Sequence, residues 1–469
     1  MQAIFYDFET SDKEPIGQIL NYSFIHVDEN FEPLAELSGD IKISRLQLPR
    51  AGAILSNRID VLEHQKRAKD DELHAMRRIL DFLCEKSRAA RKPIALIGYN
   101  SAKFDLPYLR TSMIRNGLDP YAWRKGIIDR DVLLTSRKLS VSNPNFPRSP
   151  AVGGEENRLS LRMETLAQEL GLLQGKQSHE SREDVLLTIA LAKTYRDKFG
   201  INPVTFSGYE AGHLDCEERQ PRVFGVASPN YDLTSEALSI ITPMTLLCAS
   251  QAYTLWVDLP KFQEGRGKES IFYVKKGGHS FFLAPEQDLD AKWANVAKQA
   301  QEEFKSVNLT NYFARSTCDP EQFIYRLDFD ARASLTAAIW GEERGAASAV
   351  RDRDAKMLYV RHLLRCYEWG SGKDAEIEEK LRAYALRRYG GEVVMAKSAP
   401  EPGEGGDPPN EYYHPTWRDL LTEIDTLSEQ ASQEDRKLLT SLREFYLNSD
   451  IYRVAGQLLE APSKAASAA

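Results

Sequence analysis

The chain has 469 residues, of which 42% are hydrophobic and 28% charged, and its formal net charge is −8. This length and composition predict about three domains of a soluble globular protein. No apolar run approaches the roughly 20 residues that cross a bilayer, and the N-terminus lacks a signal-peptide pattern, so we expect a cytoplasmic protein with no membrane partner. The five cysteines form no C-x-x-C pair, which argues against a disulfide framework or a structural zinc site. The acidic balance does not exclude a nucleic-acid partner, because the 61 Lys and Arg residues can still form a basic groove.

The stretch Ile4–Thr10 (IFYDFET) is a predicted β-strand that carries two acids. Side chains alternate along a strand, so Asp7 and Glu9 project from the same face among apolar neighbours. Two anions in such surroundings repel each other and lose hydration unless a cation lies between them. A divalent metal with oxygen ligands would supply that cation, and further carboxylates should then come from elsewhere in the chain. The alternative is a strand edge where both acids face water.

Further strands and helices follow from the hydrophobic pattern. Residues 17–27 alternate as a second strand and end in a turn at 28–30, and residues 40–48 are a candidate third strand. The pattern over 60–85 predicts one helix, and the apolar run at 93–99 predicts a central strand covered on both faces.

Two later acids lie at predicted helix starts. Asp105 precedes Pro107, which is typical of a helix N-cap. After a Ser- and Pro-rich loop at 138–157 and a helix at 160–171, Ser181 and Asp184 open an apolar helix with the spacing of a capping box. His179, just before that helix, has a surface position as its structural alternative.

Beyond residue 200 the pattern changes to short β-like runs, and from about residue 355 it becomes helical. The predicted domains are an α/β domain over 1–200, a β-rich domain over 201–355 and a helical domain over 356–469 that ends in a helical pair. The segment 398–410 is rich in Pro, Gly and Glu and is expected to be mobile.

The acids and the histidine have structural explanations one by one, but one function explains them together. Hydrolysis of a phosphodiester by two Mg²⁺ ions roughly 3.5–4 Å apart requires several carboxylate oxygens and a base for the attacking water. The candidate residues are Asp7, Glu9, Asp105, His179 and Asp184.

These residues lie in three motifs that resemble those of the DEDDh group of 3′–5′ exonucleases. The motifs are Phe5-x-Asp7-Phe8-Glu9-Thr10, Gly98-Tyr99-Asn100 with Phe104-Asp105, and His179-x-x-x-x-Asp184. The segments 119–123 (DPYAW) and 160–166 (SLRMETL) and the long C-terminal extension are similar to the bacterial exodeoxyribonuclease I family. This resemblance implies a ribonuclease H-like exonuclease domain, an SH3-like β-rich domain and a helical domain that together surround single-stranded DNA.

The resemblance also implies a role for each motif residue. Asp7 would bridge two metal ions, Mg²⁺ or Mn²⁺, with Glu9 and Asp184 completing one site and Asp105 serving the other. His179 would act as general base toward the attacking water. The products would be 5′-mononucleotides, released processively.

Five more residues are candidates for binding the substrate. Thr10 and Ser11 directly follow the acids and are expected to meet the terminal nucleotide. Asn100, Phe104 and Arg162 are expected to position the strand, Arg162 through a phosphate. Their structural alternatives are a core position for Phe104 and an exposed helix position for Arg162.

Two other functions remain open from the sequence. One is an exoribonuclease or RNA-end trimmer with the same motifs, and the other is a catalytically silent single-strand-binding clamp. The resemblance favours a monomer acting in DNA repair, with single-strand-binding protein as a partner.

Overall fold

A computed structural model describes residues 1–150, 157–175, 177, 179–210, 222–250, 253–276, 280–284, 290–307, 319–321, 327–341, 350–396 and 411–460. The segment 398–410, expected to be mobile, lies outside these residues. Within them, no helix is long and apolar enough to cross a membrane.

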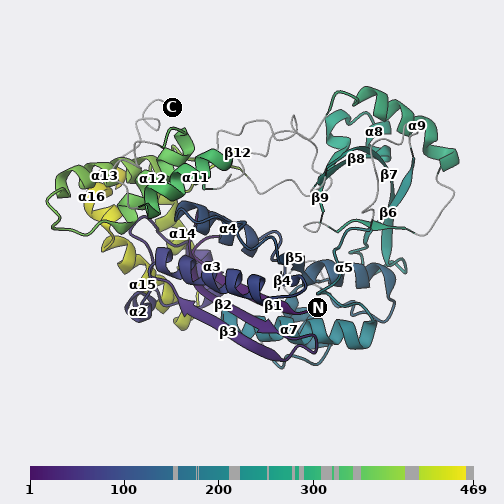
Figure 1. Cartoon of the computed structure of the whole chain (residues 1–469), viewed down its shortest axis with the longest axis horizontal. Helices are drawn as coiled ribbons and strands as arrows, with labels where there is room; N and C mark the ends of the chain where they lie inside the picture. Colours follow the sequence, from purple (N-terminus) through teal and green to yellow (C-terminus); the bar gives the residue numbers. More distant parts are fainter. Residues whose placement is uncertain are drawn as a thin grey trace.

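The first domain is built on a five-stranded sheet in the order β3-β2-β1-β4-β5 (Figure 1). β1 pairs with β2 in antiparallel fashion and with β4 in parallel, and β4 and β5 are also parallel. The strands are β1 (Ala3–Thr10), β2 (Ile19–Val27), β3 (Pro33–Asp40), β4 (Ile94–Gly98) and β5 (Ile127–Asp131).

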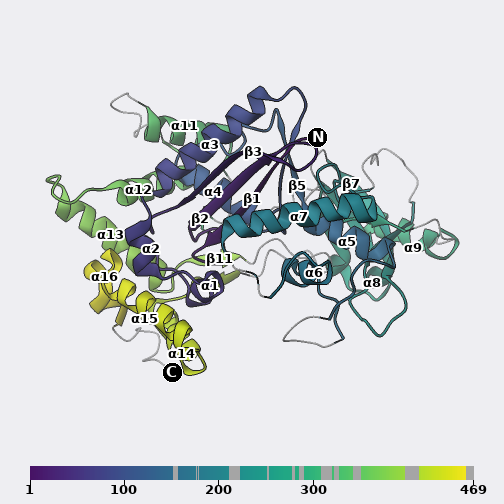
Figure 2. The ribbon, with the colours of Figure 1, turned by 90° about the horizontal axis from the view of Figure 1, so that it is seen from below.

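Helices cover both faces of this sheet, because alternate residues of β1 enter two different cores. Ile4, Tyr6 and Phe8 pack against α3 (Glu72–Ala89) and α4 (Asp105–Arg115). Ala3 and Phe5 pack on the other face against α5 (Val132–Ser142), α6 (Met163–Glu169) and α7 (Ser181–Phe199). Figure 2 shows α7 lying across β1 and β2 on this second face. Asp7 and Glu9 share the face of Phe5, which directs them toward α7.

The second domain is a five-stranded antiparallel sheet in the order β10-β6-β7-β8-β9. Trp256 of this sheet is fully buried, and the centroid of its ring lies 4.3 Å from the centroid of the Phe281 ring. The elements are β6 (Phe224–Pro229), β7 (Ser239–Ala249), β8 (Tyr253–Asp258), α8 (Leu259–Gln263), the 3₁₀ helix η1 (Gly267–Ser270), β9 (Ile271–Lys275), β10 (Phe282–Leu283) and α9 (Asp290–Glu303).

The remaining elements are mainly helical and pack against the first domain. α11 packs on α12 and shares a core cluster with Ile114 of α4. The domain boundaries stay a prediction. α11 precedes the predicted boundary at residue 355 but packs against the helix α12 that follows it. The elements are α11 (Phe329–Trp340), α12 (Arg353–Cys366), α13 (Asp374–Tyr389), the paired strands β11 (Val394–Ala396) and β12 (Glu411–Tyr413), α14 (Trp417–Glu429), α15 (Gln433–Leu447) and α16 (Asp450–Glu460).

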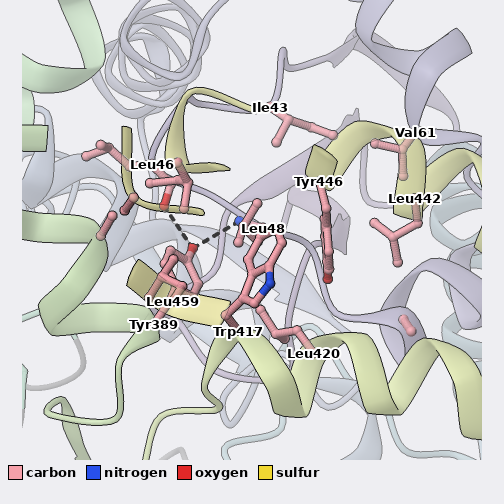
Figure 3. Packing of buried hydrophobic residues seen from close by; sticks show 14 of the residues in the cluster. Ile43, Leu46, Leu48, Val61, Tyr389, Trp417, Leu420, Leu442, Tyr446 and Leu459 are labelled. Carbon is pink, nitrogen blue, oxygen red and sulfur yellow. Dashed lines mark hydrogen bonds between the residues drawn. The ribbon is translucent and has the colours of Figure 1, made fainter. Parts of the chain in front are cut away.

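A shared core joins these helices to the segment that follows β3 (Figure 3). The hydroxyl of Tyr389 donates to the carbonyl of Leu46 over 3.0 Å and accepts from the N–H of Leu48 over 3.1 Å. Trp417 and Tyr446, both buried, close this core against α1 (Ala51–Asn57) and α2 (Val61–Arg67).

Four predicted elements are wrong in detail. The third strand is β3 at Pro33–Asp40 and not 40–48, where the backbone instead bonds to side chains such as Gln65, which accepts from Ile43. The single helix predicted over 60–85 is two helices, because Asp60 and Asp71 each cap a separate helix start. The final helical pair is three helices, α14 to α16, and α5 extends to Ser142 into the predicted loop.

Candidate active site

Three of the candidate residues meet where β1 ends and α7 begins. Glu9 is 7% exposed, Asp184 is 4% exposed in the first turn of α7, and His179 is half-buried just before that helix. Each offers a ligand atom, and these atoms lie within 4.8 Å of one another. A register shift between Glu9 and Thr10 ends the regular pairing of β1 with β2 at this point. Such irregularities commonly re-aim side chains beside functional sites.

Asp105 joins the site from α4 and does not cap that helix. Its carboxylate is 3% exposed and accepts a hydrogen bond over 3.2 Å from the backbone N–H of Phe8 in β1. The N-cap position belongs to Phe104, which makes no capping bond, so the structure contradicts the structural alternative for Asp105, an N-cap.

The structure also contradicts the structural alternative for Ser181 and Asp184, a capping box. Glu180 occupies the N-cap position without a capping bond, and the Ser181 hydroxyl donates instead to the side-chain oxygen of Asn21 in β2. Asp184 is therefore available to face Glu9.

The carboxylates raise one another's pKa values. Burial, followed by the charges of Asp105, Glu9 and Asp184, holds the pKa of Asp7 well above its usual range. Burial, with Asp184 and Asp105, raises the pKa of Glu9 to about 9. Burial raises the pKa of Asp105 to about 8, although the hydrogen bond from Phe8 opposes this rise. The four acids thus act as one cluster, in which a bound cation would favour the charged forms.

Asp184 is the least perturbed acid of the four. Burial raises its pKa to about 6, while a hydrogen bond from Gln177 and the charge of His179 lower it. The Nε2 of Gln177 donates to Oδ2 of Asp184 over 2.6 Å.

This donor set fits hard divalent cations. Mg²⁺ and Mn²⁺ prefer carboxylate oxygens, and bound cations would stabilise four carboxylates with raised pKa values, three of which are buried. The residues that could hold such ions are Asp7, Glu9, Asp105 and Asp184.

Two of the predicted site residues have a left-handed backbone. Asn100 has φ 59° and His179 has φ 53°. Among residues other than glycine, Asn and His are enriched in this region, and such conformations persist where surrounding contacts hold them. At Asn100 the contact is with Asp131, whose carboxylate accepts the N–H groups of Asn100 at 2.8 Å and Ala102 at 3.0 Å.

The residues predicted to meet the terminal nucleotide are buried. The Thr10 side chain is 4% exposed and its hydroxyl donates to the carbonyl of Asp12 over 2.8 Å. Ser11 is 1% exposed and its hydroxyl accepts from the N–H of Gln18 over 2.8 Å. Both roles stay predictions. The burial of Ser11 does not favour a contact between its side chain and the terminal nucleotide.

The residues predicted to position the DNA strand lie closer to the protein surface. Asn100 and Phe104 are half-buried, and the Phe104 ring lies 5.3 Å from that of Tyr108 at the edge of the α3–α4 core. Arg162 is exposed immediately before α6. These three roles also stay predictions.

Two residues that support the site had no motif or pattern to mark them in the sequence. Gln177 bonds to Asp184 and also donates its backbone N–H to the Glu164 carboxylate over 3.2 Å. Asp131, at the end of β5, is 2% exposed and holds the turn that leads to Asp105.

Comparisons with known proteins agree with this architecture. The structure of exonuclease I from Methylocaldum szegediense has a TM-score of 0.66, is 19% identical, and matches over 97% of this chain and 99% of its own. Exonuclease I of Escherichia coli in complex with a dT13 oligonucleotide has a TM-score of 0.67, is 17% identical, and matches over 95% of this chain and 99% of its own. The chain has the exonuclease I fold.

Sequence similarity to exonuclease I is confined to part of the chain. Exodeoxyribonuclease I of Escherichia coli is 26% identical over 204 residues, which are 42% of this chain and 40% of that protein. Exodeoxyribonuclease I of Buchnera aphidicola is 25% identical over 202 residues, which are 42% of this chain and 39% of that protein. The aligned stretch thus spans about two fifths of these relatives. No model of a known protein family matches the chain.

Proposed function

We propose that the chain is a divalent-cation-dependent 3′–5′ exonuclease that degrades single-stranded DNA to 5′-mononucleotides. The observation that carries this proposal is the meeting of four carboxylates and one histidine at the end of β1, within the exonuclease I fold. The structural relative in complex with dT13 supports a single-stranded DNA substrate.

The carboxylates would hold the cations that the reaction needs. Asp7 interacts electrostatically with all three other acids. The charges of Asp105, Glu9 and Asp184 together raise its pKa. This favours Asp7 as the residue shared by two ions, with Glu9 and Asp184 on one side and Asp105 on the other. When bound, Mg²⁺ or Mn²⁺ would neutralise charge on the phosphodiester and on the departing 3′ oxygen.

His179 is the residue suited to accept a proton from the attacking water. Its ring is half-buried and a ring nitrogen lies within 4.8 Å of a Glu9 and an Asp184 oxygen. His179 lies in the loop before α7, where its backbone is left-handed. A base must lie within hydrogen-bond reach of the proton it removes, directly or through one water.

The β-rich and helical domains support processive action on a long strand. Compact enzymes that trim RNA ends need no such extension, whereas this chain matches exonuclease I structures over both extra domains. A monomeric state and a partnership with single-strand-binding protein belong to the same proposal.

The test uses single-stranded DNA and RNA of equal length, each labelled at the 5′ end. With Mg²⁺, we expect a ladder that shortens from the 3′ end of the DNA, release of 5′-mononucleotides, and slower turnover of RNA. Asp7→Ala should abolish cleavage while circular dichroism shows a folded chain. Faster turnover of RNA would establish the exoribonuclease instead.

The same experiment separates the enzyme from a silent clamp. All five motif residues are present, which favours catalysis. Retained DNA binding without any mononucleotide release in Mg²⁺ or Mn²⁺ would establish the clamp and refute the proposal.

A further inference from the structure

A second site lies on the first domain, away from the carboxylates. It is a cavity of about 480 Å³ between the end of α3, the start of β4 and the turn before β5. Its lining residues include Ser87, Arg88, Arg91, Lys92, Lys125 and Gly126. A cavity of this size is within the range that holds small ligands.

The cavity and the carboxylates lie at opposite ends of the parallel strands. β1, β4 and β5 are mutually parallel, and the acids lie where these strands end. The cavity lies where β4 and β5 begin. Since β4 has five residues, the two sites are separated by roughly 17 Å along the strands. The cavity is thus not part of the candidate active site.

The lining of the cavity is basic. Arg88, Arg91, Lys92 and Lys125 supply four cations, and no carboxylate is among the lining residues. None of the four makes an ion pair with a residue that the structure describes. The negative end of the α3 dipole faces this region, but it amounts to about half a charge and is outweighed by four full charges. Clustered cations of this kind attract an anion.

At the wall of the cavity, the backbone at Gly126 lies close to the backbone at Ser87. A Cβ on Gly126 would lie 2.8 Å from the carbonyl oxygen of Ser87, which leaves space only for glycine unless the backbone shifts. The Ser87 hydroxyl donates to the carbonyl of Trp123 over 3.3 Å. These contacts hold the end of α3 against the turn that carries Lys125, so Arg88 and Lys125 face the same space.

We propose that this cavity binds a phosphate group of a nucleotide or nucleic acid. Arg and Lys are the usual ligands of phosphate. Protein partners generally need a large apolar or aromatic anchor, but the apolar lining residues are small: Ala90, Pro93 and Ala122. Without an aromatic lining residue, binding would not depend on base identity. The phosphate comes either from the backbone of a bound strand or from a free 5′-mononucleotide.

The test compares two double variants of the full chain in a chelator, so that no cleavage occurs. Lys92→Ala/Lys125→Ala removes two exposed cations of the cavity, whereas Lys373→Ala/Lys437→Ala removes two exposed lysines elsewhere and serves as the matched control. Calorimetry with dTMP and fluorescence anisotropy with labelled dT40 at several salt concentrations measure the two phosphate sources. Binding without metal is independent of the proposed exonuclease activity, so either proposal can fail alone.

We expect the cavity variant to weaken binding of at least one probe about tenfold, with the control unchanged. For dT40, the slope of log affinity against log salt should become shallower by about one for each phosphate that the variant no longer neutralises. An effect on dTMP alone identifies the free nucleotide as the ligand, and an effect on dT40 alone identifies the strand. If neither probe distinguishes the cavity variant from the control, or if polyglutamate binds as tightly as dT40 and loses the same affinity in the cavity variant, the proposal is wrong.

Discussion

The carboxylate of Asp105 in α4 accepts a hydrogen bond from the backbone N–H of Phe8 in β1 over 3.2 Å. This bond joins two motifs that are 97 residues apart in the chain. It places a third acid beside Asp7 and Glu9, and burial then makes the charged form of each costly.

The stability of the cation-free protein should fall as pH rises. Glu9 and Asp105 have folded-state pKa values raised to about 9 and about 8, above their ordinary values, so the folded state binds more protons than the unfolded state. Their contribution is fully present below about pH 4 and is lost as pH rises through the folded pKa values. In chelator, we expect the Tm to fall by several degrees between pH 6 and pH 9 in a thermal-unfolding series.

Addition of Mg²⁺ should reverse most of this loss at pH 8.5, because cations compensate the ionised acids. The Asp184→Asn variant should show a smaller Mg²⁺-dependent rise in Tm than the wild type. Equal responses in the two proteins would contradict the assignment of Asp184 as a ligand.

Gln177 should tune the affinity for the cation. Its amide donates to Asp184 over 2.6 Å, and residues that orient a metal ligand typically change metal affinity by about 10- to 100-fold. We expect Gln177→Ala to raise the Mg²⁺ concentration needed for half-maximal cleavage, with little change in the maximal rate. Gln168→Ala, which removes an exposed amide bonded to the Gly175 carbonyl, is the control and should leave the Mg²⁺ dependence unchanged.

His179 should be replaceable structurally but not functionally. Asn accepts the left-handed backbone that His179 adopts at φ 53°, so His179→Asn should keep the Tm within about 2 °C. Cleavage should fall by about 100-fold or more, because general-base catalysis typically contributes that much. The exposed His74→Asn serves as the control, and a His179→Asn enzyme with wild-type turnover would remove His179 from the mechanism.

Glu321 should be essential for stability although it lies outside the candidate active site. It is fully buried and forms ion pairs with Arg115 at 3.1 Å, Arg361 at 3.1 Å and Arg365 at 2.7 Å. Removing one partner of a buried ion pair typically costs about 3–5 kcal/mol, because the remaining charges are left uncompensated.

Urea unfolding of Glu321→Ala measures this cost. Glu434→Ala is the matched control, since Glu434 pairs with Arg58 on the surface and should contribute less than about 1 kcal/mol. A difference below about 1 kcal/mol between the two variants would show that the buried network does not stabilise the protein.

The sequence alone was sufficient to predict the acids and the histidine of the candidate active site, of which Glu9, His179 and Asp184 meet in the structure. Asp7 and Glu9 are conspicuous because local alternation places them in an apolar strand, and Asp105, His179 and Asp184 follow from motif spacing. Local pattern also predicted β1, β2, β4, α4 and α7 with small errors at their ends. These features depend on neighbours within a few residues, which a sequence displays directly.

Only the tertiary structure decided which polar groups meet. The bond from Gln177 to Asp184, the hold of Asp131 on Asn100, the burial of Ser11 and the cations gathered around Lys92 depend on segments brought together by folding. The helical caps considered as structural alternatives for Asp105 and Asp184 do not form for the same reason: these carboxylates bond to partners in β1 and in the loop before α7 instead of to the local backbone. Such partners are chosen by the packing of the sheet against α4 and α7, because a buried carboxylate must find its donors within the core that surrounds it.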